Sequence, residues 1–263
     1  ALKCANFWLE IVGRAKAVGE DYEKGEYFLN QWKVFSGFVS RLENISERCL
    51  FSLKYYVFGQ ALEHYLALYD EAETGDPVIL QRIGRCHKAR GNYESAISFL
   101  EEASRQKRED ACILAELADC YSLVNENRAA KVLFREAFFL NSEAIELSYL
   151  ESPMIQRLIA KLREKFSEAE ICDWLPVYGA IFGLFNVKRE LRPLELGKLK
   201  QAIYQLEKDL ENRRQGPLVP RLINHYFWLI DHYLASGEER LKIEEVLERI
   251  RILDPTVHKE YTS

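Results

Sequence analysis

The sequence of 263 residues lacks a long apolar run. Its most apolar stretch, 176–187, has the length of one short helix and ends at Lys188 and Arg189, whereas a helix that crosses a bilayer needs about 18 or more apolar residues. The sequence also lacks an excess of basic residues, because 36 Lys and Arg against 41 Asp and Glu give a net charge of −5. We therefore expect no membrane span and no nucleic-acid partner, since nucleic-acid binding requires a clustered basic face.

The sequence has no motif that indicates an enzyme. It contains no glycine-rich phosphate loop, no HExxH and no GxSxG, and we interpret carboxylate pairs such as Glu101-Glu102 as solvated helix faces. His225 and His232 are seven residues apart on one predicted helix, but metal sites usually have three or four converging ligands. We interpret both histidines as packed or surface residues. The sequence therefore predicts no catalytic residue, no cofactor and no metal site.

Six cysteines occur, and no two of them have the CxxC spacing. Several take positions at which a helix needs a small apolar residue, a role that unpaired cysteine fills in protein cores. This usage favours a reducing, cytoplasmic compartment, although the even number leaves disulfides open. No signal peptide is recognisable, and the sequence starts at Ala1 without an initiator methionine, which leaves open a truncated or processed N-terminus.

Apolar residues recur at helical spacing through almost the whole sequence, and no segment alternates as a strand does. The pattern predicts an all-α protein of twelve or thirteen helices. We expect separate helices over 46–56 and 58–72. We also expect two short helices, 167–174 and 176–186, on either side of a proline kink.

A pattern in residues 80–137 occurs twice, with an offset of 34 positions. At equivalent positions the two copies have side chains of similar size, either both large or both small. The pairs are Leu80 and Leu114, Gly84 and Ala118, Ala96 and Ala130, Leu100 and Phe134, Ala103 and Ala137. A unit of this length cannot bury its apolar face alone, so it must stack on a neighbour. Small residues such as Gly84 and Ala118 let facing helices approach closely, and we assign the same role to Gly179 and Gly183.

The first copy, with Gly84, the turn Gly91-Asn92-Tyr93 and Ala96, resembles a tetratricopeptide repeat. The second copy is similar but has no glycine in its turn, and 58–77 resembles the second half of a further unit. The resemblance implies antiparallel helix pairs stacked as a right-handed solenoid with a concave groove. We accordingly divide the chain into aromatic-rich N-terminal helices that cap the array (1–44), tetratricopeptide-like repeats (45–142), and C-terminal helices that continue or cap the solenoid (143–263).

In tetratricopeptide proteins the first helix of each pair lines the groove, which typically holds a peptide or helix of another protein. Carried onto this sequence, the resemblance implies these groove-facing residues: Gln81, Arg82, Arg85, Lys88, Ala115, Glu116, Asp119 and Ser122. Arg82, Arg85 and Lys88 suit an acidic peptide, because arginine binds a carboxylate through two hydrogen bonds. Alternatively, these cations pair with Glu116 and Asp119 on the helix one repeat away, or are simply solvated.

The N-terminal region holds more aromatic residues than two helices normally bury. They are Trp32, Phe35, Phe38, Phe51, Tyr55, Tyr56 and Phe58. One interpretation is a core shared between the helix 24–42 and the first repeat. The other is an exposed apolar patch, which would mark a protein contact.

Together these features predict a non-enzymatic scaffold or adaptor that binds a peptide or helix of a partner protein in the groove. A second hypothesis is a self-assembling structural module, hence a homo-oligomer. That module would use the aromatic surface or a leucine seam with coiled-coil spacing, formed by Leu196, Leu199, Ile203, Leu206 and Leu210. A third hypothesis is a regulatory or docking region of a larger multidomain protein.

Overall fold

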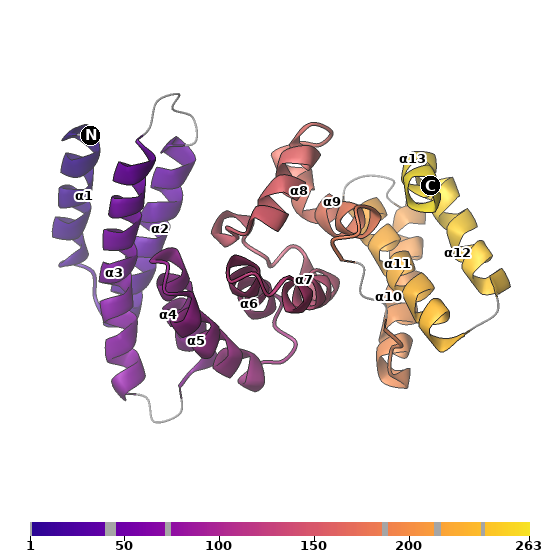
Figure 1. Cartoon of the computed structure of the whole chain (residues 1–263), viewed down its shortest axis with the longest axis horizontal. Helices are drawn as coiled ribbons and strands as arrows, with labels where there is room; N and C mark the ends of the chain where they lie inside the picture. Colours follow the sequence, from indigo (N-terminus) through magenta and orange to yellow (C-terminus); the bar gives the residue numbers. More distant parts are fainter. Residues whose placement is uncertain (1, 40–45, 72–74, 186–188, 213–216, 238–239) are drawn as a thin grey trace. The chain divides into compact units, whose positions relative to one another are not determined.

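The computed structural model of the chain (Figure 1) describes residues 2–39, 46–71, 75–185, 189–212, 217–237 and 240–263. Thirteen α-helices and one short 3-10 helix form the regular structure of these ranges, which contain no strand. The all-α fold class that the helical spacing predicts is therefore confirmed.

The α-helices are, in chain order, α1 (Leu2–Ala15), α2 (Asp21–Val39), α3 (Glu47–Glu71), α4 (Pro77–Ala89), α5 (Tyr93–Gln106), α6 (Ala111–Leu123), α7 (Asn127–Asn141), α8 (Pro153–Arg163), α9 (Glu168–Ile181), α10 (Pro193–Asn212), α11 (Leu218–Ser236), α12 (Arg240–Leu253) and α13 (Pro255–Thr262). The 3-10 helix η1 (Leu147–Tyr149) lies between α7 and α8. The chain forms two compact units, Ala1–Asn125 and Glu126–Ser263, and each is described by itself. The unit boundary lies inside the predicted repeat segment 45–142, between α6 and α7.

In the first unit, each helix from α1 to α5 packs against the next one along the chain. Figure 1 shows α1, α2 and α3 side by side. An aromatic core joins these helices: the ring centres of Trp8 and Trp32 are 6.1 Å apart, and those of Trp32 and Phe58 are 5.7 Å apart. Phe28 and Phe35 are buried beside Trp32 on one face of α2, because the three positions follow the i, i+4, i+7 spacing of a helix stripe. This sequential packing agrees with stacked helices, and the right-handed superhelix stays a prediction.

Two helix breaks that we expected from the sequence are wrong. The expected helices 46–56 and 58–72 form one helix, α3, because Val57 and Phe58 at the expected break are buried in the core. Helix α9 is also continuous and contains Pro176. An internal proline costs a helix about 3 kcal/mol, and the burial of this part of α9 offsets that cost.

Close packing at small residues is present at Gly84 and Gly179. A Cβ atom added at Gly84 would lie 2.6 Å from Cγ of Leu100 on α5, and a Cβ atom added at Gly179 would clash with the Phe185 ring. Gly183 has a different role. Its φ of +69° is left-handed, which glycine adopts without strain, and an added Cβ would meet nothing within 4 Å. The packing role that we assigned to Gly183 is therefore wrong, and this residue forms the turn after α9.

The second unit is organised around α11, which packs against α9, α10 and α12. Side chains of α11 such as Ile223, Phe227 and Ile230 are almost completely buried. Leu199 and Ile203 of α10 are buried as well, and α10 packs along α11. The middle of the predicted leucine seam is therefore occupied within the chain, which corrects its assignment as a surface for self-assembly.

Candidate protein-interaction site

The predicted groove residues come together between α4 and α6. Nη2 of Arg85 donates a hydrogen bond to Oε1 of Glu116 at 2.6 Å, and Nε2 of Gln81 donates to the same oxygen at 2.7 Å. Further along the helices, Nζ of Lys88 lies 3.0 Å from Oδ2 of Asp119. Pairing with the helix one repeat away, one of the alternatives that we considered, is therefore the arrangement of Arg85 and Lys88.

Most of this set is buried. Arg82 is partly buried, and its Nε lies 2.5 Å from Oε1 of Glu26 on α2. Burial alone would raise the pKa of Glu116, but the charge and hydrogen bonds of Arg85 lower the pKa below its usual value, so this carboxyl group is ionised. The cations are neutralised within the first unit, where they join α4 to α6 and α2. The role of the set in holding a partner stays a prediction, and its buried members are Gln81, Arg85, Lys88, Ala115, Glu116, Asp119 and Ser122.

The aromatic set divides into a buried and an exposed group, so each of our two interpretations describes part of it. Trp32, Phe35 and Phe58 are buried in the core between α1, α2 and α3. The exposed members are Phe38, Phe51, Tyr55 and Tyr56.

Phe51 and Tyr55 belong to a stripe on α3 that is buried further along the helix. The stripe consists of Phe51, Tyr55, Phe58, Leu62 and Tyr65, spaced i, i+4, i+7, i+11 and i+14. Its last three members are buried, whereas Phe51 is 57% exposed and Tyr55 is 43% exposed. The cause is a difference in length, because α3 has 25 residues and α4, which packs on it, has 13. We call Phe51 and Tyr55 the open stripe.

Arg90 directly follows α4 and lies at the point on α3 where the contact with α4 ends. Its guanidinium carbon lies 4.3 Å from the centre of the Tyr55 ring and 3.7 Å from the position of a Cβ atom added at Gly59. Nε of Arg90 is buried without a hydrogen-bond partner, and within the described residues Arg90 forms no ion pair. The aromatic ring therefore holds a cation that retains hydrogen-bonding capacity at the edge of the open stripe.

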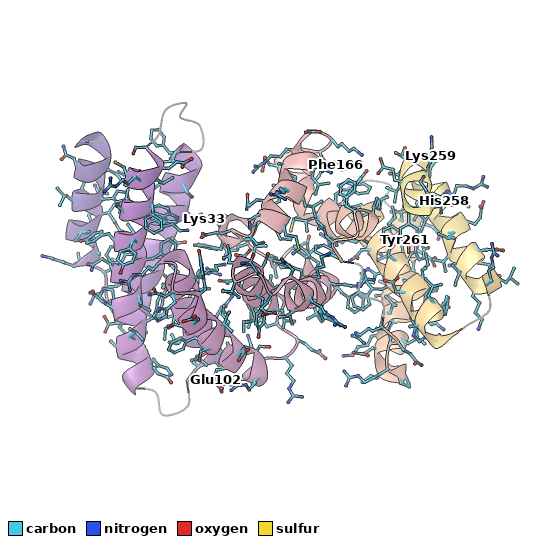
Figure 2. All side chains as sticks on the ribbon, in the orientation of Figure 1. Lys33, Glu102, Phe166, His258, Lys259 and Tyr261 are labelled. Atoms are coloured by element: carbon cyan, nitrogen blue, oxygen red, sulfur yellow. The ribbon has the colours of Figure 1, made fainter. Side chains whose placement is uncertain are left out.

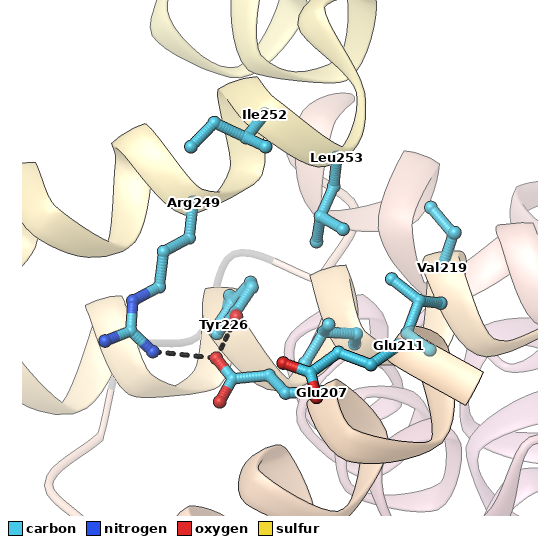
Figure 3. Close-up of a pocket in the computed structure, with 9 residues that line it drawn as sticks. Glu207, Glu211, Val219, Tyr226, Arg249, Ile252 and Leu253 are labelled. Carbon is cyan, nitrogen blue, oxygen red and sulfur yellow. Dashed lines mark hydrogen bonds and ion pairs between the residues drawn. The ribbon is translucent and has the colours of Figure 1, made fainter. Parts of the chain in front are cut away.

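The second unit has a pocket of about 460 Å³ between α10, α11 and α12 (Figure 3). Oη of Tyr226 and Nη1 of Arg249 both donate to Oε1 of Glu207, at 2.5 and 2.7 Å, so this carboxylate is satisfied. Burial raises the pKa of Tyr226 far above its usual value, so its hydroxyl group stays protonated. The pocket is therefore lined mainly by apolar side chains, and its polar residues Tyr226, Arg249 and Glu207 bond to one another. Its lining residues are Glu207, Leu210, Glu211, Val219, Leu222, Tyr226, Arg249, Ile252 and Leu253.

A smaller cavity of about 170 Å³ lies between the end of α7, α9 and α11. In its wall, Nε of Arg221 donates to Oδ1 of Asp173 at 3.0 Å, and the guanidinium group also pairs with Glu143. Burial raises the pKa of Asp173 to about 6. The cavity is therefore bordered by a carboxyl group that titrates in mildly acidic solution, and no pattern in the sequence indicates this property.

The raised pKa of Asp173 predicts how stability depends on pH. The unfolded chain releases this proton near pH 4 and the folded chain near pH 6, so the contribution of Asp173 to the free energy of unfolding falls as the pH rises through this interval. Relative to Asp173→Asn, wild type should therefore lose up to about 3 kcal/mol of unfolding free energy between pH 4 and pH 7. Urea unfolding at a series of pH values measures this difference.

Glu195 provides a control of opposite sign. Hydrogen bonds from Arg192 and Arg189 lower its pKa to about 2, so its stabilising contribution is complete above its unfolded pKa and is lost as the pH falls toward 2. The free energy of wild type minus that of Glu195→Gln should therefore rise with pH. If the difference in unfolding free energy between wild type and Asp173→Asn is the same at pH 4 and pH 7, the raised pKa of Asp173 is contradicted.

The two histidines of α11 have separate contacts and do not converge. Nδ1 of His232 accepts a hydrogen bond from the backbone N–H of Leu191 at 3.1 Å, whereas Nδ1 of His225 lies 2.7 Å from the carbonyl oxygen of Arg221. The described residues contain no group of three or more His, Cys, Asp or Glu side chains placed to hold a metal ion. The cysteines whose side chains the structure describes form no disulfide; they are Cys49, Cys86, Cys112, Cys120 and Cys172. Of the helices in the described ranges, none is both long enough and apolar enough to cross a membrane.

A scan against protein-family models gave no match for this chain, and a search of curated proteins also gave none. The likeness to tetratricopeptide repeats therefore remains a resemblance. It is based on the residues of the two sequence copies, and the sequential packing of helices in the first unit is compatible with it.

Proposed function

We propose that the chain is a non-enzymatic scaffold that binds a helix or peptide of another protein, and that the open stripe of α3 holds part of that partner. One observation carries the proposal: Phe51 and Tyr55 occupy positions that are buried along the rest of the stripe, yet both are exposed. Aromatic side chains grouped on an exposed face mark protein contacts, and Tyr and Arg are enriched among the residues that dominate binding energy.

The surroundings of the open stripe make it a preformed surface. Below it, Phe58 packs on Trp32 of α2, and Oη of Tyr65 donates to Oε1 of Glu26 at 2.7 Å. The helix that carries Phe51 and Tyr55 is therefore fixed along its buried half. A fixed surface lowers the entropy cost of binding, because little of the scaffold has to become ordered.

We assign the main contact to the open stripe and not to the charges between α4 and α6. A partner that took Arg85 or Lys88 as a ligand would separate it from Glu116 or Asp119, which are buried. Removing one member of a buried pair costs several kcal/mol, because it leaves a buried charge uncompensated. The paired residues then serve the proposed function by fixing α4, which Arg90 directly follows, to α6.

Self-assembly through the same surface is the second candidate, because an exposed aromatic stripe can also contact its own copy. Sedimentation equilibrium separates the two candidates. A chain that stays monomeric at high concentration contradicts self-assembly.

Replacement of Phe51 and Tyr55 by serine should weaken partner binding at least about tenfold, because it removes the two aromatic anchors. Affinity capture followed by quantitative mass spectrometry, with the wild type and the double variant in parallel, measures the loss. The matched control is Tyr204→Ser, which removes an aromatic residue that is 66% exposed on α10. The proposal fails if no protein is captured specifically, or if the double variant captures the same proteins as the control.

A further inference from the structure

We infer that the partner segment is an acidic amphipathic helix, and this inference rests on the proposed function. The chain as a whole is acidic, with a net charge of −5. The border of the open stripe, however, carries two arginines that form no ion pair within the described residues: Arg48 on α3 and Arg90 directly after α4.

Arg48 follows the open stripe on α3 itself. It precedes Phe51 by three residues and Tyr55 by seven, so the three side chains lie on one side of the helix. Arg48 is exposed, as are Phe51 and Tyr55. The stripe therefore presents two aromatic residues with a cation at one end.

Lys33 lies on the α2 side of the open stripe. Glu26 of α2 pairs with Arg82 of α4. Lys33 comes seven residues after Glu26, so both residues lie on the side of α2 that faces α4. Its neighbour in sequence, Trp32, contacts Phe58, which places Lys33 near the point where the buried part of the stripe ends. Figure 2 labels Lys33 on the first unit.

Arg90 supplies the most specific feature of this surface. Its guanidinium group is fixed over the Tyr55 ring, and its Nε is buried and lacks a hydrogen-bond partner. A carboxylate is the ligand that a guanidinium group binds best, through two parallel hydrogen bonds. An Asp or Glu side chain of the partner would pair with the guanidinium group while an apolar neighbour contacts Tyr55.

The balance of charge around the stripe favours an acidic partner over a neutral or basic one. Between Glu47 and Tyr55, helix α3 has one carboxylate, Glu47, against the two arginines Arg48 and Arg90 at this surface. The uncovered part, from Glu47 to Tyr55, is about 13 Å long at 1.5 Å per residue. This length suits a partner helix of about two and a half turns with apolar residues at i, i+3 or i+4 and i+7, flanked by Asp or Glu.

The experiment is selection of binders from a displayed library of randomised helical peptides on the full chain. We expect the selected sequences to combine apolar residues at helical spacing with flanking Asp and Glu. Binding of a selected peptide, measured by fluorescence anisotropy, should fall at least about tenfold in Arg90→Glu and in Arg48→Glu, and it should weaken with added salt. Arg108→Glu, an exposed position after α5, is the matched control and should leave binding unchanged.

The outcomes separate this inference from the proposed function. If the selected peptides are neutral or basic and lose binding in the Phe51→Ser, Tyr55→Ser variant, the inference is overturned and the proposed function stands. If no peptide is selected, or if the two serine substitutions leave peptide binding unchanged, the inference and the proposed function are both overturned. A dimer that the serine variant dissociates would make a second copy of the chain the occupant, which also overturns the acidic helix. Circular dichroism of each variant checks that it is folded, and Arg48→Glu keeps the test valid if Arg90→Glu unfolds.

Discussion

Replacement of Asp231 by alanine is expected to lower the free energy of unfolding of the second unit by about 3–5 kcal/mol. Asp231 on α11 pairs with Arg135 on α7, and the two side chains are 7% and 5% exposed. Arg135 also donates to the carbonyl oxygen of Phe185 at 2.7 Å and lies over the Trp228 ring. Burial lowers the pKa of Arg135 to about 10, so it remains a cation at neutral pH. Without Asp231 this buried cation loses its ion-pair partner.

Urea unfolding gives the free-energy change, and hydrogen exchange read by mass spectrometry shows whether the loss is confined to peptides of the second unit. The double variant Arg135→Leu with Asp231→Ala should lose less than the sum of the two single losses, because no buried charge is left behind. Glu244→Ala is the control, since it breaks a pair with Arg240 whose side chains are 90% and 55% exposed, and it should cost less than about 1 kcal/mol. A loss for Asp231→Ala as small as that of the control would show that the buried pair does not support the unit.

The helices of this protein could be predicted from the sequence because each has a local signal. Asp76 followed by Pro77 indicates a helix start, and in the structure the Asp76 carboxylate accepts a hydrogen bond from the N–H of Val78 at 2.8 Å. Gly91 indicates the end of the same helix, and it has a left-handed φ of +81°. Breaks inside a helix were predicted less well, because at Val57 tertiary burial decides whether the chain continues.

The candidate site could be predicted only in part, for the same reason. Helical spacing placed Arg85 and Lys88 on one side of α4, but their burial depends on Glu116 and Asp119, which belong to another helix. The importance of Arg90 was missed because it follows from the unequal lengths of α3 and α4. That difference was hidden while two helices were expected over 46–72.

Contacts between distant residues of the second unit had no signal in the sequence. Arg135 and Asp231 are 96 positions apart, and Asp173 and Arg221 are 48 apart. Each pair joins two helices, and no local sequence pattern shows that these helices become neighbours in the folded chain. Periodicity shows which side of a helix is apolar, but it does not show which charged residue on that side will find a partner.

Gly84→Val is expected to destabilise the first unit by about 3 kcal/mol, at the upper end of the range for overpacking. The added Cβ alone would lie 2.6 Å from Cγ of Leu100 and 3.2 Å from the carbonyl oxygen of Ala96. Leu100 and Ala96 are completely buried, so neither has room to move aside. The two further methyl groups of valine increase the overlap, and the change forces α4 and α5 apart.

Gly37→Val on α2 is the matched control, because a Cβ atom added there meets nothing within 4 Å. In an exposed helix, valine in place of glycine should be neutral or stabilise by a few tenths of a kcal/mol. Thermal and urea unfolding of both variants measure the contrast within one unit. The repeat places alanine at position 118 where the first copy has Gly84, so sequence equivalence alone predicts that a side chain is tolerated. A Gly84→Val variant as stable as the control would support that equivalence and contradict the close approach of α4 and α5.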